Sequence, residues 1–313
     1  MYKVVQLAHP GKEWPGYSQA KKQYIKSKKG IIWNKQYEAG IREWNNLDSH
    51  KRKFIFSKNS TYIDSKGKLN TGDITFWGEW EPHSTFELIS KDSKDFYGPR
   101  MMHFPYFNRS YDGPKKHTTD PFVFGNNFWY THCKQSTKQP AQSLKKLQAD
   151  SIIIMGSERS KDKTFLVDTI FVIKRRYSQS EIRDKINSLP KLLLQTNLIM
   201  HDDHDLIRSS KYSDFGFYEG KNNQEGNMFS FVPAKLFCKK DVAHERLVIN
   251  TYDKFFNLQR AGAGSVNRVV MQSRSFSEVK QYWDKLVHES FNQGFVLATN
   301  IPMPQQFSSN PAL

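Results

Sequence analysis

Short apolar runs, separated by polar residues and by glycine or proline, dominate the first half of the chain. Strands are predicted for "YKVVQLAH", "RKFIFSKNSTYID" and "DITFWGEWEP", with the polar segment "SKGKLNTGD" joining the last two. The segment "SLKKLQADSIIIMGSERSKDKTFLVDTIFVIKRR" predicts a short helix, a strand, a polar hairpin turn and a long strand. Residues 1–175 are therefore expected to be rich in sheet.

The second half mixes helices with strands. "SQSEIRDKINSLPKLLLQ" predicts a helix that ends at Pro190, while "GNMFSFVPAKLF", "RLVINT" and "FVLATNIPMP" predict strands. The segment "SFSEVKQYWDKLVHESFNQG" predicts a C-terminal helix. We expect Ser277 to cap this helix and Gly294 to end it, because serine favours the first position and glycine the last.

The order of these elements indicates an α+β fold. Strands come first and helices later, without a βαβ rhythm, so we predict a mixed or antiparallel barrel-like sheet with peripheral helices. A single large domain over 1–313 is expected. This domain can be divided into a β-rich core with an aromatic insert over 1–175 and an α+β part over 176–313 that completes the domain. The sequence contains no G-x-G-x-x-G or P-loop motif, and the glycines of "AGAGSVNR" have no strand-to-helix context, so we predict no cofactor.

Composition narrows the class of protein. With 313 residues, of which 37% are hydrophobic and 14% aromatic, the chain is expected to bury a substantial core. Its longest apolar runs are too short to cross a bilayer, and its first residues do not resemble a signal peptide. Cys133 and Cys238 are expected to be reduced and packed as small apolar residues. We therefore predict a cytoplasmic protein with no membrane partner.

The formal net charge of +16 favours a polyanionic partner. Residues 1–70 alone hold 15 Lys and Arg against 5 Asp and Glu. Phosphate backbones are the commonest large polyanion in a cell, so nucleic acid or a nucleotide is the predicted partner. The alternative is an ordinary solvated surface rich in lysine.

A first candidate site combines histidines with basic residues. His9 follows the N-terminal strand at "AHPG", and His50, Arg52 and Lys53 precede another strand at "DSHKRKF". Histidine can exchange protons near neutral pH, and arginine and lysine bind phosphate, so these residues could hold and protonate a phosphodiester or a base. Alternatively, His9 satisfies backbone groups at a turn and "HKRK" is a basic loop.

A second candidate site is the stretch "ITFWGEWEPHS". In a regular strand, Trp77 and Glu79 share one face, whereas Trp80 lies with Phe76 on the other. Glu81 precedes Pro82 at the strand end, where apolar surroundings would suit a general acid or base. Three interpretations stay open: core tryptophans with ion-paired glutamates, stacking surfaces for a base, or a catalytic carboxylate.

Aromatic residues are concentrated in the segment that follows. Between Phe76 and Tyr130 there are 15 Phe, Trp and Tyr in 55 residues, which favours a deep pocket with aromatic walls. Asp120 begins a turn, and Gln135 lies at the far end of "TTDPFVFGNNFWYTHCKQ", where it could line the pocket mouth beside Glu79. The acidic segment "HDDHD" at 201–205 has no recognised metal-ligand spacing, so we predict no metal.

The segment "SLKKLQADSIIIMGSERSKDKTFLVDTIFVI" resembles the core of PUA-like domains of the EVE and ASCH kind, in which a helix leads to a strand and a hairpin. The whole chain is also similar to uncharacterised bacterial proteins linked to nucleotide modification or phage defence. The segments that carry this similarity are "HPG", "HKRKF", "GEWEP", "DPFVFG", "GS…LVDTIFV" and "GNMFSF". The resemblance implies a nucleic-acid or nucleotide context and assigns no catalytic residue.

These observations lead to one main hypothesis and two alternatives. The main hypothesis is a nucleic-acid- or nucleotide-interacting protein, in which a basic N-terminal region grips phosphates and Trp77 and Trp80 stack on a base. The first alternative is a hydrolase of nucleic acid or nucleotides that uses Glu79 or Glu81 with His50. The second is a protein-interaction subunit of a defence complex.

Overall fold

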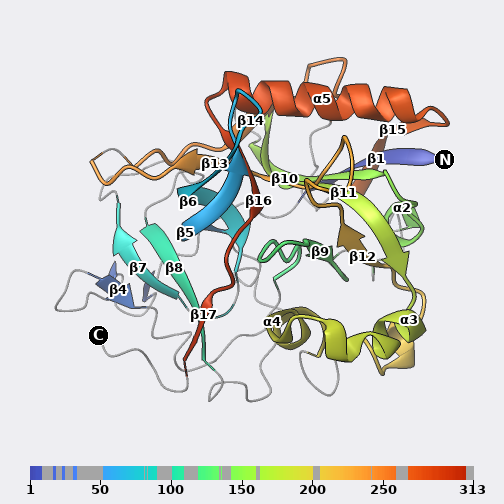
Figure 1. The fold of residues 1–313 in the computed structure, drawn as a ribbon, viewed down its shortest axis with the longest axis horizontal. Coiled ribbons are helices and arrows are strands. Elements are labelled where there is room, and N and C mark those ends of the chain that lie inside the picture. Colours follow the sequence, from blue (N-terminus) through green and yellow to red (C-terminus); the bar gives the residue numbers. More distant parts are fainter. Residues whose placement is uncertain are drawn as a thin grey trace.

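The chain has the predicted α+β class, with two mixed β-sheets and peripheral helices (Figure 1). The computed structural model describes the following residues: 1–8, 17–18, 23–24, 31–33, 52–80, 82, 84–89, 101–108, 119–133, 135, 142–159, 163–199, 205–240, 242–258 and 267–307.

The first sheet has seven strands around two long central ones. Its order is β15 (Asn267–Ser273), β1 (Tyr2–Ala8), β10 (Ile152–Arg159), β11 (Thr164–Tyr177), β12 (Phe217–Gly220) and β9 (Trp129–Tyr130), and β14 (Leu247–Asn250) also pairs with β11. Among the described strands of this sheet, β1 and β10 run parallel to each other, and the other pairings are antiparallel. The predicted polar hairpin joins β10 to β11.

The second sheet has eight strands and contains a closed ring of hydrogen-bonded pairs. Its order is β16 (Val296–Asn300), β13 (Val232–Leu236), β6 (Leu69–Glu79), β5 (Arg52–Ile63), β8 (Met101–Asn108), β7 (Ser84–Leu88) and β4 (Ile31–Trp33), and β17 (Gln305–Phe307) pairs with β8. Because β16 also pairs with β5, the strands β5, β6, β13 and β16 close on themselves. A separate two-stranded pair consists of β2 (Tyr17–Ser18) and β3 (Gln23–Tyr24).

Helices are short except at the C-terminal end. They are α2 (Gln142–Lys145), α3 (Gln179–Asp184), the 3-10 turns η2 (Ile186–Ser188) and η5 (Ser210–Tyr212), α4 (Lys191–Leu193), the π-helical turn η3 (Leu194–Leu198) and α5 (Phe276–Asn292). A capping box between Ser178 and Glu181 begins α3. The helical segment ends just before Pro190, as predicted, because Leu189 is extended at ψ 149°. Pro190, with ψ 130°, is then the N-cap of the next short helix, α4.

The long helix α5 forms where the sequence predicts it, but it begins earlier than the predicted cap at Ser277. Its N-cap is Ser275 rather than Ser277, so the predicted cap is wrong by two positions. Gly294 ends the helix as expected, in a left-handed conformation at φ +71° that suits glycine. One face of α5 buries Val279 and Trp283, and the Trp283 ring lies 4.9 Å from that of Phe229.

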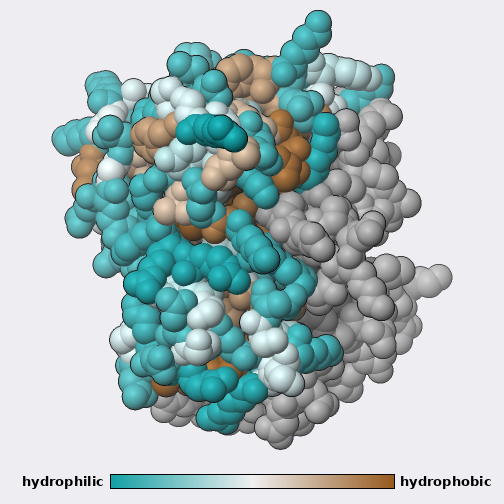
Figure 2. Space-filling view, turned by 90° about the vertical axis from the view of Figure 1, so that its right-hand side faces the viewer, coloured by the Kyte–Doolittle hydropathy of each residue, from teal (hydrophilic) through white to brown (hydrophobic). Residues whose placement is uncertain are grey.

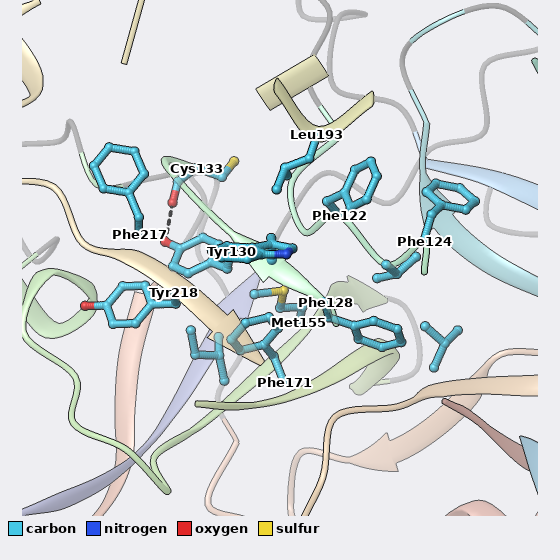
Figure 3. Packing of buried hydrophobic residues seen from close by; sticks show 14 of the residues in the cluster. Phe122, Phe124, Phe128, Tyr130, Cys133, Met155, Phe171, Leu193, Phe217 and Tyr218 are labelled. Carbon is cyan, nitrogen blue, oxygen red and sulfur yellow. Dashed lines mark hydrogen bonds between the residues drawn. The ribbon is translucent and has the colours of Figure 1, made fainter. Parts of the chain in front are cut away.

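Two large hydrophobic clusters form the core. One contains Phe122, Phe124 and Phe128 together with aromatic side chains of β9 and β12, among them the stacked rings of Tyr130 and Tyr218 (Figure 3). The other lies under α5 and includes Phe229 and Phe231. Among the coloured residues in Figure 2, hydrophilic ones predominate and hydrophobic ones form small patches.

The second sheet opens into a fork between β5 and β8. These strands pair in parallel only at Phe54 with Met102 and at Ile55 with His103. Beyond this point β5 pairs with β16, and β8 pairs with β17. The two strands therefore separate, and among the described residues no backbone hydrogen bond between β5 and β8 closes the space beyond these pairs.

A bulge in β5 lies beside the fork. Ser57 pairs with Ile74 and Ser60 with Gly72, so the two residues 58 and 59 face only one residue of β6. Asn59 adopts a left-handed conformation at φ 52°, and Asp73 Oδ1 accepts its backbone N–H at 3.0 Å. An extra residue of this kind bends a strand and changes the direction of its side chains, and here it leaves Lys58 and Asn59 exposed at the fork.

Candidate functional site

A hollow of about 490 Å³ occupies the fork between β5 and β8. We call it the fork groove. Its aromatic walls are Phe56, Phe104, Tyr106 and Phe124. Its polar lining is Ser57, Lys58, Asn59, Thr85 and Gln305, and the segment 302–304 completes the wall. The volume lies within the range of small-molecule sites, about 300–1,000 Å³.

Phe104 is the aromatic side chain best placed to contact a ligand. It is partly exposed, and its ring lies 5.3 Å from the ring of Phe56. Phe56 in turn meets Phe237 edge-on at 4.7 Å, so the platform is supported from behind. A supported aromatic ring beside an exposed lysine can stack on a flat group and attract an adjacent anion.

The two tryptophans of the predicted site lie in the core. The prediction that they occupy opposite faces of β6 is confirmed, because Trp80 shares a cluster with Phe76 whereas Trp77 belongs to another cluster. The exposed fractions are 2% for Trp77 and 0% for Trp80. Trp80 meets Phe124 edge-on at 5.2 Å, and the guanidinium of Arg246 lies 4.9 Å from the Trp77 ring. Their described contacts are those of core residues, and stacking on a base stays a prediction.

The predicted catalytic residues are only partly described. His9, His50 and Glu81 lie outside the described residues, so their convergence on one site stays a prediction. Glu79 is buried at the end of β6, where it is 2% exposed and paired in register with Arg52. The side chain of Arg52 also lies outside the described part of the chain.

Lys53 belongs to a buried polar cluster. Its Nζ donates to the carbonyl oxygen of Pro82 at 3.2 Å and to Ser84 Oγ at 3.4 Å. Ser84 Oγ and His103 Nδ1 are 2.9 Å apart and share a hydrogen bond. Burial, followed by the nearby charge of Lys53, holds the pKa of His103 well below 6.5, so its imidazole is neutral at physiological pH. The cluster ties β5, β7 and β8 together at the base of the fork.

The side chain of Asp120 stabilises the backbone of the loop between residues 120 and 133. Its carboxylate accepts the backbone N–H groups of Thr131 at 2.8 Å, His132 at 2.8 Å and Cys133 at 2.6 Å. Asp120 is 0% exposed, and the peptide bond to Pro121 is cis. The described contacts of Asp120 therefore fix the backbone of the loop that carries Phe122 and Phe124.

Gln135 joins the same loop to the strand β12. Its Nε2 donates to the carbonyl oxygens of Gly216 at 2.7 Å and Thr131 at 3.0 Å, and its Oε1 accepts the N–H of Gly216. The side chain is fully buried. The predicted role of Asp120 and Gln135 in ligand binding stays a prediction, while their described hydrogen bonds are structural.

Two smaller predictions have mixed outcomes. Cys133 is buried as expected, but Cys238 is exposed, so the prediction is wrong for the second cysteine. In the segment 201–205 only Asp205 is described, and its Oδ1 accepts the N–H groups of Ile207 and Arg208. Within the described ranges, no three His, Cys, Asp or Glu side chains are grouped as a metal site would require.

Sequence reasoning found the aromatic region but not the groove itself. The high density of aromatic residues before Tyr130 includes Phe104, Tyr106 and Phe124. The remaining wall comes from Met303 and its neighbours, about 200 positions later in the chain, and no local pattern connects them. The bulge at Lys58 and Asn59 was also not predictable, because it depends on how β5 pairs with β6.

Comparisons with known proteins give no match. No protein-family description fits the sequence, and neither a curated protein nor a solved structure is significantly similar to it. No helix among the described residues has the length and apolar character needed to cross a membrane.

Proposed function

We propose that the protein binds nucleotides or nucleic acid and holds a base in the fork groove. The observation that carries the proposal is the supported, partly exposed ring of Phe104 beside the exposed Lys58. Aromatic rings bind bases of any sequence by stacking, and a nearby lysine attracts the phosphate that each nucleotide carries. Phe104 replaces the buried tryptophans as the stacking surface in this proposal.

The charge of the chain supports a phosphate-containing ligand. A formal net charge of +16 attracts polyanions over a distance set by the ionic strength. Contacts between lysine and phosphate add affinity without reading sequence, so discrimination would fall to the groove. The comparisons match no nucleotide-modification protein, so a role in bacterial defence or nucleic-acid modification is proposed from the resemblance of the sequence segments alone.

Replacing Phe104 with alanine tests the proposal. Fluorescence anisotropy with a labelled single-stranded oligonucleotide, and competition with AMP, should show a loss of affinity of about 5- to 150-fold, since stacking on an aromatic side chain contributes about 1–3 kcal/mol per base. Phe255→Ala is the matched control, because Phe255 is 44% exposed and packs beside α5 rather than in the groove.

The outcome separates the proposal from its alternatives. Binding that is equal in Phe104→Ala and Phe255→Ala would contradict the role of the groove. Turnover of the oligonucleotide or nucleotide that is lost in Glu79→Gln while binding persists would favour the hydrolase. No binding above a weak, salt-sensitive background would favour the protein-interaction subunit.

A further inference from the structure

A second hollow adjoins the fork groove. Its volume is about 290 Å³, and it shares Met303 and Pro304 with the groove as lining residues. Its other lining residues are Phe107, Pro190, Lys191, Leu192 and Gln195. Because the two hollows have a wall in common, a ligand longer than one nucleotide can extend from the groove into the second space.

Each hollow is lined by one exposed lysine. Lys58 belongs to the fork groove and Lys191 to the second hollow. Among the described residues, the lining of neither hollow includes an aspartate or a glutamate. An anionic group therefore meets an attracting charge in each hollow and no repelling carboxylate in its lining.

These two lysines are also free to pair with a ligand. No salt bridge joins Lys58 or Lys191 to an acidic side chain in the described ranges. Lys174, in contrast, already contacts Glu219 at 2.9 Å and Glu225 at 2.5 Å. An ammonium group without a carboxylate partner can direct its donors at a phosphate, with which it forms charge-assisted hydrogen bonds.

The accessible apolar wall of the second hollow comes from a methionine and two prolines. Met303 is 38% exposed, and Pro190 and Pro304 are partly exposed, whereas Phe107 and Leu192 are buried. Methionine and proline side chains can cover the apolar face of a base or the carbon skeleton of a ribose, and this contact depends on buried area rather than on the identity of the base. The second hollow is therefore expected to add affinity without a preference for one base.

We propose that the two hollows bind two successive nucleotides, one on each side of Met303. The first base stacks on Phe104, and its phosphate pairs with Lys58. The second nucleotide packs on the wall of the adjoining hollow, and its phosphate pairs with Lys191. This inference rests on the proposed function and extends it from one nucleotide to a unit with two phosphates.

Binding of AMP and of the dinucleotide pApA to the wild type, Lys58→Met and Lys191→Met tests the inference. Lys191→Met should weaken pApA about twofold to fivefold at low salt, the range of one exposed ion pair, and leave AMP unchanged. The slope of log K against log salt for pApA should also fall by about 0.7, the contribution of one phosphate contact in a single strand. Lys58→Met should weaken both ligands.

Lys146→Met is the matched control. Lys146 is exposed and lines neither hollow, so this variant loses the same charge without losing a predicted contact. The difference between Lys191→Met and Lys146→Met separates a local contact from the general attraction of a basic protein for anions. Equal melting temperatures of the variants would show that the fold is intact.

Different results have different meanings. If Lys191→Met weakens pApA no more than Lys146→Met does, or weakens AMP equally, the two-nucleotide inference is wrong, while loss of binding in Phe104→Ala would still support the proposed function. If neither ligand binds the wild type, both fail. Once the effect of Lys191 is established, longer oligoadenylate identifies the source of the unit. Affinity that rises with length and depends more steeply on salt indicates a nucleic-acid strand, and affinity independent of length indicates a free dinucleotide.

Discussion

Replacing Arg246 with methionine is expected to destabilise the protein strongly, because Arg246 neutralises a carboxylate in the interior. Arg246 Nε and Nη2 both donate to Asp168 Oδ1, at 3.0 and 2.6 Å, and Nη2 also donates to Ser157 Oγ at 2.6 Å. The side chains of Arg246 and Asp168 are 3% and 0% exposed. The guanidinium also lies over Trp77 of β6, so one side chain connects the two sheets.

The size of the expected loss of stability follows from the burial of the Arg246–Asp168 ion pair. Methionine preserves much of the apolar stem of Arg246 but leaves Asp168 without the guanidinium, and removing one partner of a buried ion pair costs about 3–5 kcal/mol. Replacing both charges with apolar residues of similar volume often costs much less. The double variant Arg246→Met/Asp168→Leu should therefore recover a large part of the stability that Arg246→Met loses.

Urea-induced unfolding followed by circular dichroism measures the effect. Arg175→Met is the matched control, because Arg175 pairs with Glu181 where the side chains are 56% and 44% exposed, and exposed pairs contribute about 0–1 kcal/mol. If Arg246→Met and Arg175→Met lose the same free energy of unfolding, the argument from the buried charge is wrong. A double variant less stable than Arg246→Met would refute the part of the argument that concerns Asp168.

Two further predictions concern the core and the buried polar cluster. Trp80→Ala should lower the free energy of unfolding by about 3–5 kcal/mol, because the ring is fully buried against Phe124, and a loss below about 1 kcal/mol in urea-induced unfolding would contradict this packing. The pKa of His103 lies well below its unfolded value of 6.5, so the unfolded chain binds the proton first and stability should fall as the pH drops below about 6.5, by up to about 1.4 kcal/mol per pH unit. Compared with the wild type, His103→Gln should lose less free energy of unfolding between neutral and acidic pH, and identical slopes would show that His103 does not titrate in this way.

Much of the fold could be predicted from local patterns. The predicted strands "RKFIFSKNSTYID" and "DITFWGEWEP" form the pair β5 and β6, and the helix at 276–292 forms where its apolar spacing indicates. Period-two alternation correctly placed Trp77 and Trp80 on opposite faces of β6. These features depend on residues close together in sequence, which is why sequence alone was enough.

The sequence by itself determined the basic charge, the α+β class and the concentration of aromatic residues before Tyr130. Only the tertiary structure decided which aromatic side chains stay accessible. Both faces of the chain from Ile74 to Trp80 are covered by other segments, so Trp77 and Trp80 are buried. The separation of β5 from β8, in contrast, leaves Phe104 partly exposed in the groove that Met303 also lines. Periodicity shows which side chains share a face. Whether that face meets core or ligand depends on distant segments, and these are brought together only when the chain folds.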